Sequence, residues 1–220
     1  MHFTSWTKAQ LVAETYVRPR AAQDGLFRVL DVGSKRYQGH LTYREAFDIP
    51  NVEYTGLDLE PGANVDLVPA SPYVWNEIQD ASYDLCISGQ TFEHNPFFWV
   101  TMAEVVRVLK PGGIAVVIAP GRGAVHRYPV DCWRFFPDAW SALCTYVGLE
   151  PLETLFEDYS FTHTAKGAEW CDSTLIAEKP RFAAESEAAA FRARLAAIKA
   201  SLPESELAKT PGPVQRCART

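Results

Sequence analysis

One stretch decides the fold, residues 27–33, which read Phe27-Arg28-Val29-Leu30-Asp31-Val32-Gly33. A short apolar run that ends in an acid and a glycine is typical of a buried strand followed by a tight turn. Three further runs have this character, at residues 54–59, 83–88 and 114–119. The last is apolar at every position, as expected of a parallel strand covered on both faces. We therefore predict four central strands of a parallel sheet.

Helical patterns separate these runs. Between the last two, apolar residues recur at helical spacing until Pro111-Gly112-Gly113; they are Phe98, Met102, Val105, Val106 and Leu109. The alternation of strand and helix predicts an α/β fold with a doubly wound, Rossmann-like sheet. Residues 149–159 and 172–179 read as two weaker strands, and we expect them to form a hairpin at one edge of the sheet.

The C-terminal part of the chain differs from this core. We predict one domain over residues 1–180, an amphipathic helix over 181–202 and a flexible tail over 203–220. The helix has an apolar stripe formed by Ala184, Ala188, Phe191, Leu195, Ile198 and Leu202. Such a stripe covers its own domain or forms a dimer seam, and we favour the cover because fewer than three heptads is short for a coiled coil. The chain is thus expected to be a monomer or a homodimer.

Composition excludes several classes of protein. The 220 residues carry 21 Lys and Arg against 27 Asp and Glu, a net charge of −6, which disfavours nucleic acid as a partner. The five cysteines include no C-x-x-C pair, which argues against a disulfide framework and a thiolate zinc site. No basic segment followed by an apolar stretch begins the chain, and no window approaches eighteen apolar residues. We expect a cytoplasmic protein without a membrane span.

Polar residues that follow the predicted strands indicate a ligand, because a doubly wound sheet binds ligands beyond the carboxyl ends of its strands. Gly33 permits close backbone approach, and Asp58 could accept both hydroxyls of a ribose. Each has a structural alternative, a tight turn for Gly33 and a helix N-cap for Asp58. Lys35 stands where a dinucleotide fold would have a second glycine. The pattern favours a nucleoside and disfavours a pyrophosphate.

Taken in order, four segments resemble class I S-adenosylmethionine-dependent methyltransferases: residues 31–34, 56–59, 83–94 and 107–113. The resemblance runs from about Arg28 to Lys179. It implies a seven-stranded sheet of order 3-2-1-4-5-7-6 with an antiparallel last strand. It also implies S-adenosylmethionine as the cofactor and S-adenosylhomocysteine as its product. The first loop departs from the family pattern, because only Gly33 and Gly39 remain of its glycines.

The resemblance also implies a set of cofactor-binding residues. Asp31 and Gly33 would lie against the methionine part, with Ser34 and Gly39 shaping the first loop. Asp58, followed by Leu59, would hold the ribose, and Asp66 is the acid available for the adenine. Ser88, Gly89 and Gln90 would lie beside the sulfonium. No metal is expected.

Two clusters go beyond a bare cofactor-binding fold. The first is the pair Glu93 and His94, after the strand at 83–88, and the second follows the strand at 114–119. The second combines titratable and aromatic groups, namely His126, Tyr128, Asp131, Trp133, Arg134, Phe135 and Phe136. Aromatic surfaces with a few polar groups can hold a small acceptor, and we expect Glu93, Tyr128, Trp133 and Arg134 to bind it.

A structural reading of the same clusters stays open. Arg134 could be a salt-bridge partner of Asp131, Asp138 could be a helix N-cap, and the aromatics could belong to the core. In this reading His94 anchors a loop.

We predict methyl transfer to a hydroxyl of a small or exposed acceptor, such as a sugar, a glycan or a secondary metabolite. His126 is the expected general base because imidazole is largely neutral near neutral pH, with Asp131 orienting its ring and His94 the next candidate. Alternatively, His126 and Asp131 help to seat a divalent ion. Rival functions are N-methylation of a small amine, a nicotinamide oxidoreductase, and an inactive cofactor-binding or regulatory module of this fold.

Overall fold

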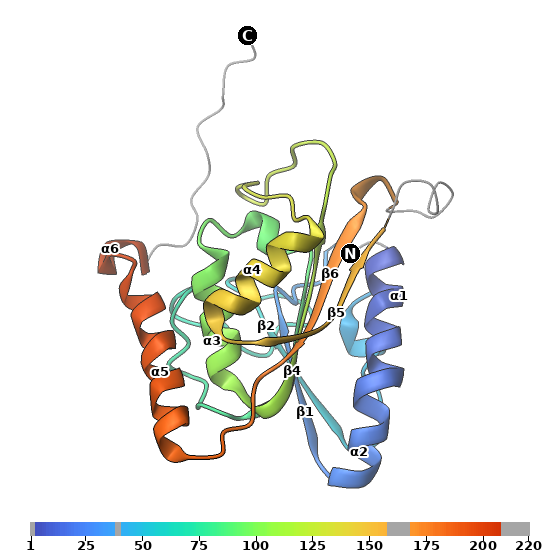
Figure 1. Cartoon of the computed structure of the whole chain (residues 1–220). Helices are drawn as coiled ribbons and strands as arrows, with labels where there is room; N and C mark the ends of the chain where they lie inside the picture. Colours follow the sequence, from blue (N-terminus) through green and yellow to red (C-terminus); the bar gives the residue numbers. More distant parts are fainter. Residues whose placement is uncertain (1–2, 38–40, 158–167, 208–220) are drawn as a thin grey trace.

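The computed structural model describes residues 3–37, 41–157 and 168–207 (Figure 1). Within these ranges six strands form one mixed sheet of order β2-β1-β3-β4-β6-β5. They are β1 (Phe27–Val32), β2 (Val52–Leu57), β3 (Tyr83–Gly89), β4 (Leu109–Pro120), β5 (Glu150–Phe156) and β6 (Asp172–Glu178). The first four are parallel, whereas β6 runs antiparallel to both β4 and β5.

The predicted α/β sheet is therefore confirmed, including its four parallel strands, its edge hairpin and its antiparallel strand. The strand expected at 54–59 is found as β2, but it is the outermost of the described strands and not a central one. The strand order is the expected one without its outermost member, and the count of seven was wrong for the part of the chain described. Beyond β2 there is one parallel bridge, between Leu57 and Leu67. Pro69 and Pro72 follow closely, and proline cannot donate a hydrogen bond to a strand ladder, so pairing does not continue.

Helices cover both faces of the sheet (Figure 1). On one face lie α3 (Phe98–Val108), α4 (Pro137–Val147) and α5 (Glu185–Ala200). On the other face lie α1 (Phe3–Val12), the π-helical turn Ala13–Val17 and α2 (Arg18–Asp24). Shorter segments are α6 (Glu204–Leu207) and the 3-10 turns Tyr43–Glu45, Phe92–His94 and Ala168–Trp170.

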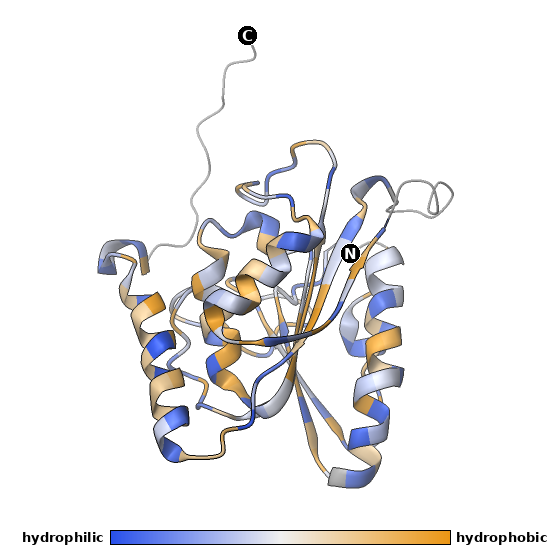
Figure 2. Ribbon diagram, viewed as in Figure 1, coloured by the Kyte–Doolittle hydropathy of each residue, from blue (hydrophilic) through white to orange (hydrophobic). Residues whose placement is uncertain are grey.

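Strand residues alternate between two apolar layers. Leu30, Cys86 and Val117 pack toward α3, α4 and α5. Val29, Ile87 and Val116, each one position earlier or later in its strand, pack toward α1 and α2. The strands at the centre are accordingly hydrophobic along most of their length, whereas the helices mix both kinds of residue (Figure 2). Burial on both faces explains why these strands read as continuous apolar runs.

The predicted helices are found near their expected positions. The helix expected at 98–110 is α3, and the one expected at 181–202 is α5, whose Leu195 and Ile198 are buried in the same cluster as α3. This packing is the intramolecular cover we favoured. Residues Glu204–Leu207, expected within a tail, form α6, and positions after 207 lie outside the described residues. Asp138 lies in the first turn of α4, and Phe136 holds the N-cap position suggested for it.

Helix α1 was not predicted from the sequence. Its inward face carries Thr4, Ser5 and Lys8, which are buried although they are polar. Thr4 donates a hydrogen bond of 2.9 Å to Asp172 at the start of β6, and Ser5 shares one of 2.5 Å with the hydroxyl of Tyr43. Because polar residues occupy part of the buried face, the apolar periodicity that would reveal this helix is weak.

Two further expectations concern membranes and cysteines. Among the described helices, none combines the length and the apolar character needed to cross a bilayer. Among the described cysteines, Cys86, Cys132 and Cys144 are free thiols.

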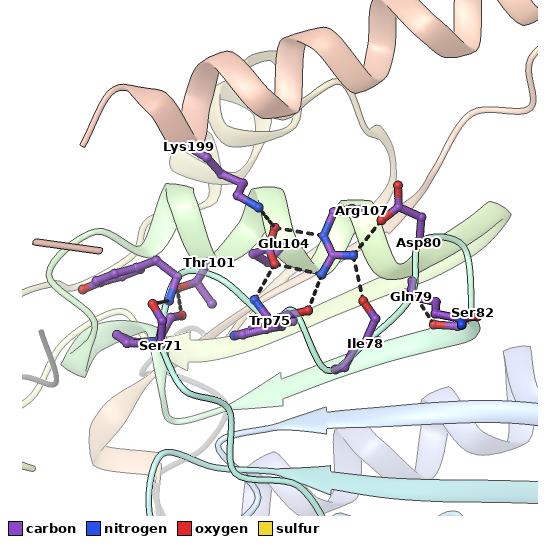
Figure 3. Close-up of polar contacts among 12 residues, drawn as sticks. Ser71, Trp75, Ile78, Gln79, Asp80, Ser82, Thr101, Glu104, Arg107 and Lys199 are labelled. Atoms are coloured by element: carbon purple, nitrogen blue, oxygen red, sulfur yellow. Dashed lines mark hydrogen bonds and ion pairs between the residues drawn. The ribbon is translucent and has the colours of Figure 1, made fainter. Parts of the chain in front are cut away.

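A buried charge network joins α3 to the loop before β3 and to α5 (Figure 3). Glu104 of α3 is fully buried and accepts hydrogen bonds from Arg107, from the backbone N–H of Trp75 at 2.8 Å and from Lys199 at 2.7 Å. Burial alone would raise the pKa of Glu104, but the bonds from Arg107 and Lys199 outweigh it and hold that pKa below its ordinary value. The carboxylate thus connects three segments that are distant in sequence.

We predict that Glu104→Gln lowers the free energy of unfolding by about 3 kcal/mol, because it leaves two cations without their buried partner. Urea unfolding followed by circular dichroism measures the change. The control is Glu185→Gln, which removes a carboxylate whose side chain is 80% exposed and pairs with Arg192. It should leave stability unchanged. Equal losses in the two variants would contradict a central role for Glu104.

Candidate active site

The carboxyl ends of the parallel strands β1 to β4 meet at one edge of the sheet. Gly33 follows β1, Asp58 follows β2, Gln90 follows β3, and residues 121–136 connect β4 to α4. The residues expected to bind a cofactor and an acceptor follow these strands, so the topology brings them to the same edge.

The first loop turns sharply at Gly33. Its φ of +85° lies in the left-handed region, and a Cβ there would collide with the side chain of Thr91. The N–H groups of Gly33 and Ser34 both donate to the carbonyl of Leu57, at 2.8 and 3.1 Å. The Ser34 hydroxyl donates to the carbonyl of Asn64 at 3.1 Å. Gly33 is therefore required by the close approach of three strand ends, and Gly39 lies outside the described residues.

Asp31 is buried at the end of β1, only 2% exposed. The hydroxyl of Tyr54 donates a hydrogen bond to its carboxyl group. Burial raises the pKa of Asp31 to about 7, although the bond from Tyr54 opposes the shift. A carboxyl with this pKa gains or loses a proton near neutral pH, which makes it sensitive to a charged ligand beside it.

Asp58 is held by backbone donors from two sides. Its carboxylate accepts the N–H of Lys35 at 3.0 Å and the N–H of Glu60 at 3.2 Å. Burial raises its pKa while these bonds oppose the rise. Each carboxylate oxygen accepts one bond here and has a second lone pair for a ribose hydroxyl. Leu59, next in the chain, is half-buried.

Asp66 has contacts that account for it without an adenine. Its carboxylate accepts the N–H of Gly56 at 2.7 Å and an ion pair from Arg44. Its own N–H donates to the carbonyl of Gly56 at 2.8 Å. These bonds hold the loop of residues 62–67 against β2, and the adenine role expected for Asp66 stays a prediction.

The segment Ser88-Gly89-Gln90 presents its backbone to this edge, while two of its side chains are used elsewhere. The Ser88 hydroxyl donates to the carbonyl of Val32 at 2.8 Å and is buried between β1 and β3. Gly89 lies so close to the Tyr43 hydroxyl that a Cβ would collide with it. Gln90 has a φ of +58° and directs its amide across β4 to Asp172 at 2.9 Å. Of this segment, the backbone of Gly89 and Gln90 is what a ligand could approach.

Glu93, His94 and His126 form a compact group after β3 and β4. The Nε2 atom of His94 lies 3.6 Å from Oε1 of Glu93. The rings of His94 and His126 meet edge to face, with centroids 4.7 Å apart. Glu93 and His94 lie in the turn Phe92–His94, and His126 lies in the loop after β4. The structure thus brings the two predicted clusters into one, which we call the Glu93–His94–His126 cluster.

Backbone bonds fasten the loop after β4 to this turn. The N–H groups of Cys132 and Trp133 both donate to the carbonyl of Glu93, at 2.7 and 3.3 Å. Nδ1 of His94 lies 2.6 Å from the carbonyl of Val130. A carbonyl only accepts hydrogen bonds, so Nδ1 carries the proton and Nε2 of the neutral ring keeps a lone pair. His94 therefore anchors the loop through Nδ1, and the lone pair of its Nε2 is available to accept a proton or bind a metal ion.

The Glu93 carboxylate is fully buried, and neither of its oxygens has a hydrogen-bond partner in the part of the chain that the structure describes. Burial raises its pKa to about 8. Burial also lowers the pKa of His94, and the neighbouring His126 lowers it further, whereas the bond that Nδ1 donates to the Val130 carbonyl opposes the shift. A buried polar group without a partner is costly, and in native proteins it usually marks a catalytic role or an absent ion.

Asp131 does not hold the His126 ring as the sequence suggested. Its carboxylate receives two bonds from Arg134, at 2.6 and 2.8 Å, and one from the backbone N–H of His126 at 2.7 Å. Burial would raise the pKa of Asp131, but the Arg134 bonds outweigh it and keep it below its ordinary value. Nδ1 of His126 lies 3.5 Å from this carboxylate, without a hydrogen bond. Asp131 thus holds the backbone of His126. Its salt bridge with Arg134 is the one that the structural reading of the sequence proposed.

The aromatic residues divide between surface and core. Tyr128 is 57% exposed and touches the rings of His94, His126 and Tyr37. Trp133 is partly exposed, and its indole N–H donates to the carbonyl of Asn95 at 2.9 Å. Phe135 is buried and stacks on Trp140 at 4.7 Å, so it belongs to the core. Of these three, Tyr128 and Trp133 remain available to an acceptor.

Sequence reasoning missed several residues of this edge. Trp170 lies with its ring centroid 4.4 Å from that of His126, and Tyr37 links the first loop to Tyr128 with centroids 5.8 Å apart. The Tyr43 hydroxyl lies against Gly89 at the end of β3, and the Tyr54 hydroxyl donates to Asp31 at the end of β1. No spacing rule marks them, because each arrives from a segment with no regular strand or helix pattern or from a neighbouring strand.

Comparison with known proteins bears on this arrangement. Residues 30–117 match a protein family described as "Methyltransferase domain". The chain has the fold of the class I methyltransferases. This confirms the resemblance seen in the sequence.

Among curated relatives, an uncharacterized methyltransferase of Mycobacterium ulcerans is 31% identical over 120 residues, which are 50% of this chain and 45% of that protein. The chain thus spans about half the length of the curated methyltransferases that it matches.

Solved structures share the fold at low sequence identity. The 1,6-didemethyltoxoflavin-N1-methyltransferase of Burkholderia thailandensis, solved with S-adenosylhomocysteine, has a TM-score of 0.59 at 13% identity and covers 80% of this chain and 79% of its own. The [4+2]-cyclase SpnF has a TM-score of 0.56 at 21% identity, with 80% and 82% covered. The methyltransferase fold therefore serves more than one reaction type, and the site must decide the function.

The raised pKa of Asp31 predicts a pH effect on stability. Between about pH 4 and 7 this carboxyl is protonated in the folded chain and ionised in the unfolded chain. The free energy of unfolding therefore falls as pH rises through that window. Asp31→Asn still accepts the Tyr54 bond but cannot titrate. Its stability relative to the wild type should rise by on the order of 1 kcal/mol per pH unit. Urea unfolding at pH 5, 6 and 7 measures this.

The matched control is Asp48→Asn, because Asp48 is exposed. It should keep the pH dependence of the wild type. If Asp31→Asn also keeps it, the Asp31 carboxyl does not retain its proton in the folded chain.

Proposed function

We propose that the protein transfers a methyl group from S-adenosylmethionine to a small or exposed acceptor, in the first place a hydroxyl of a sugar, a glycan or a secondary metabolite. One observation carries this proposal: the carboxylates expected to bind the cofactor and the Glu93–His94–His126 cluster lie at the same edge of the sheet. The Tyr37–Tyr128 ring contact and the fit of Gly33 against Thr91 link the two.

The described residues suit this cofactor. Asp58 offers fixed carboxylate lone pairs to a ribose diol, and its two backbone donors keep it in place. The buried carboxyl of Asp31, at the end of β1, favours a nearby positive charge, such as the amino group of the methionine part.

S-adenosylmethionine supplies a methyl carbon on a positively charged sulfur, which leaves as neutral S-adenosylhomocysteine when a new bond to the acceptor forms. The protein must then align the acceptor and take its proton. Alignment in an in-line displacement contributes several kcal/mol, and a positioned base adds roughly 10²- to 10⁴-fold. His126 is the first candidate for the proton acceptor, because its side chain is partly exposed within the cluster.

A nitrogen acceptor is the second candidate function. The Burkholderia enzyme with this fold methylates a ring nitrogen according to its name, and it superimposes on most of this chain. An amine that arrives deprotonated needs no base. The two candidates therefore differ in whether removal of His126 slows the reaction.

A ligand screen tests the cofactor class. S-adenosylhomocysteine at 100 times its dissociation constant should stabilise the protein by ~2.7 kcal/mol in a thermal-shift assay, whereas NAD and NADP should not. Stabilisation by the dinucleotides alone would overturn the proposal.

Asp58→Ala should weaken S-adenosylhomocysteine binding by about 10- to 100-fold, corresponding to ~1.5–3 kcal/mol for hydrogen bonds to a charged group. Isothermal titration calorimetry measures the affinity. Glu60→Ala is the control, because Glu60 lies two residues away and its exposed side chain forms an ion pair with Lys35. It should bind normally, and an unchanged affinity in Asp58→Ala would remove Asp58 from the ribose site.

His126→Ala should lower kcat by roughly 10²- to 10⁴-fold while leaving S-adenosylhomocysteine affinity within a few fold, because the lost group acts on the acceptor in the transition state. Release of S-adenosylhomocysteine over a panel of hydroxyl and amine acceptors measures turnover. Val125→Ala, next in the loop and 69% exposed, controls for disturbance of the loop. Wild-type turnover in His126→Ala would point to an acceptor that needs no base.

A further inference from the structure

Three metal-ligating side chains converge in the Glu93–His94–His126 cluster. Each offers one oxygen or nitrogen atom, and these atoms all lie within 4.8 Å of one another. In one of these pairs, Oε1 of Glu93 lies 3.6 Å from Nε2 of His94. Ligands about 2.0–2.1 Å from a tetrahedral zinc ion are separated by roughly 3.4 Å, so only small side-chain shifts would close the set around an ion.

The Glu93 carboxylate points independently to a cation. It is 0% exposed, and neither oxygen has a hydrogen-bond partner among the residues that the structure describes. Arg134 uses both terminal nitrogens on Asp131 and on the carbonyls of Ala124 and Trp133, and its buried Nε makes no hydrogen bond to Glu93. A buried carboxylate is usually paired or coordinates a metal ion, and within the described ranges no Lys or Arg forms an ion pair with this one.

The histidines are prepared as ligands. The bond between Nδ1 of His94 and the Val130 carbonyl fixes the tautomer that leaves Nε2 free toward Glu93. A backbone carbonyl that orients the second nitrogen in this way is the usual support of a metal-bound histidine. Nδ1 of His126 is buried and has no hydrogen-bond partner among the described residues, while the side chain as a whole is 25% exposed.

We propose that Glu93, His94 and His126 bind one divalent transition-metal ion, with two imidazole nitrogens and one carboxylate. This donor set suits Zn²⁺, Co²⁺ or Fe²⁺ and not Mg²⁺ or Ca²⁺, which prefer oxygen ligands. Three protein ligands leave coordination positions open. The metal alternative raised by the sequence paired His126 with Asp131, but the structure gives Asp131 to Arg134 and supplies Glu93 and His94 instead.

The role of the ion, though not its binding, rests on the proposed function. A metal ion lowers the pKa of a hydroxyl that coordinates it, so a sugar or polyol acceptor would lose its proton near neutral pH. Tyr128, exposed beside both histidines, would then border the acceptor. In this arrangement His126 would be a metal ligand in place of the proton acceptor considered above, and the proton of the acceptor would leave to solvent.

The test is metal binding by the full chain after treatment with a chelator. Zn²⁺ affinity is measured by calorimetry with a competing chelator, and Co²⁺ is added separately to record its visible absorption. We expect one ion per chain, with affinity reduced at least 100-fold in Glu93→Gln and in His126→Gln and the Co²⁺ spectrum lost. Glu104→Gln is the control, since it also removes a fully buried carboxylate, but one that Arg107 and Lys199 satisfy. Circular dichroism confirms that each variant is folded.

Absence of binding to the wild type, or equal binding by Glu93→Gln, His126→Gln and the control, would overturn the site. Should one variant fail to fold, the other decides, because the two ligands come from different segments of the chain. S-adenosylhomocysteine affinity is measured on the same samples. Cofactor binding without metal binding defeats this inference and leaves the proposed function standing, whereas metal binding without cofactor binding does the reverse.

Discussion

The structure depends on the parallel pairing of β3 with β1 on one side and β4 on the other. Val29 pairs with Leu85, and Leu85 pairs with Ile114, so the three strands run in the same direction in register. Their carboxyl ends therefore lie side by side, and so do the segments that leave them. The first loop, the Glu93–His94 turn and the loop carrying His126 therefore lie next to one another. Short bonds then fix the contact, above all the double donation to the Glu93 carbonyl.

Three buried carboxyl groups show how the surroundings assign different roles to the same chemistry. Glu104 accepts from two cations and a backbone amide, which lowers its pKa and makes it a structural connector. Asp31 has one donor, Tyr54, and burial raises its pKa to about 7. No described side chain donates to either oxygen of Glu93, and burial raises its pKa to about 8. A buried carboxylate with fewer hydrogen-bond donors from the protein has a higher pKa. At the functional edge, such a group gains more from a cation or a donor that binds beside it.

The sequence predicted what depends on periodicity and strand-end spacing. Runs such as Ile114–Ala119 indicated the central strands, and the spacing of Phe98 to Leu109 indicated α3. It could not reveal α1, because Thr4, Ser5 and Lys8 occupy its buried face and bond to distant residues. The joining of His94 to His126 was likewise hidden, because it depends on the path of the loop after β4. The orientation of Asp131 was misjudged since Arg134, three residues on, holds the carboxylate more strongly than an imidazole would.

The first loop keeps only Gly33 and Gly39 of the glycines typical of the family, and its described part is held in place by other means. In a dinucleotide fold, the glycine-rich turn leads into a helix whose N-terminus binds the pyrophosphate. Here the described residues after β1, 33–37 and 41–51, contain only the 3-10 turn Tyr43–Glu45 and no α-helix. The loop is fastened instead to the segment after β2, by the N–H of Lys35 on Asp58 and the N–H of Arg36 on the carbonyl of Ala63. A ligand with a ribose but no phosphate would need a carboxylate and not a helix N-terminus. The bonds that fasten this loop hold the Asp58 carboxylate at the edge of the sheet where the proposed cofactor would place its ribose.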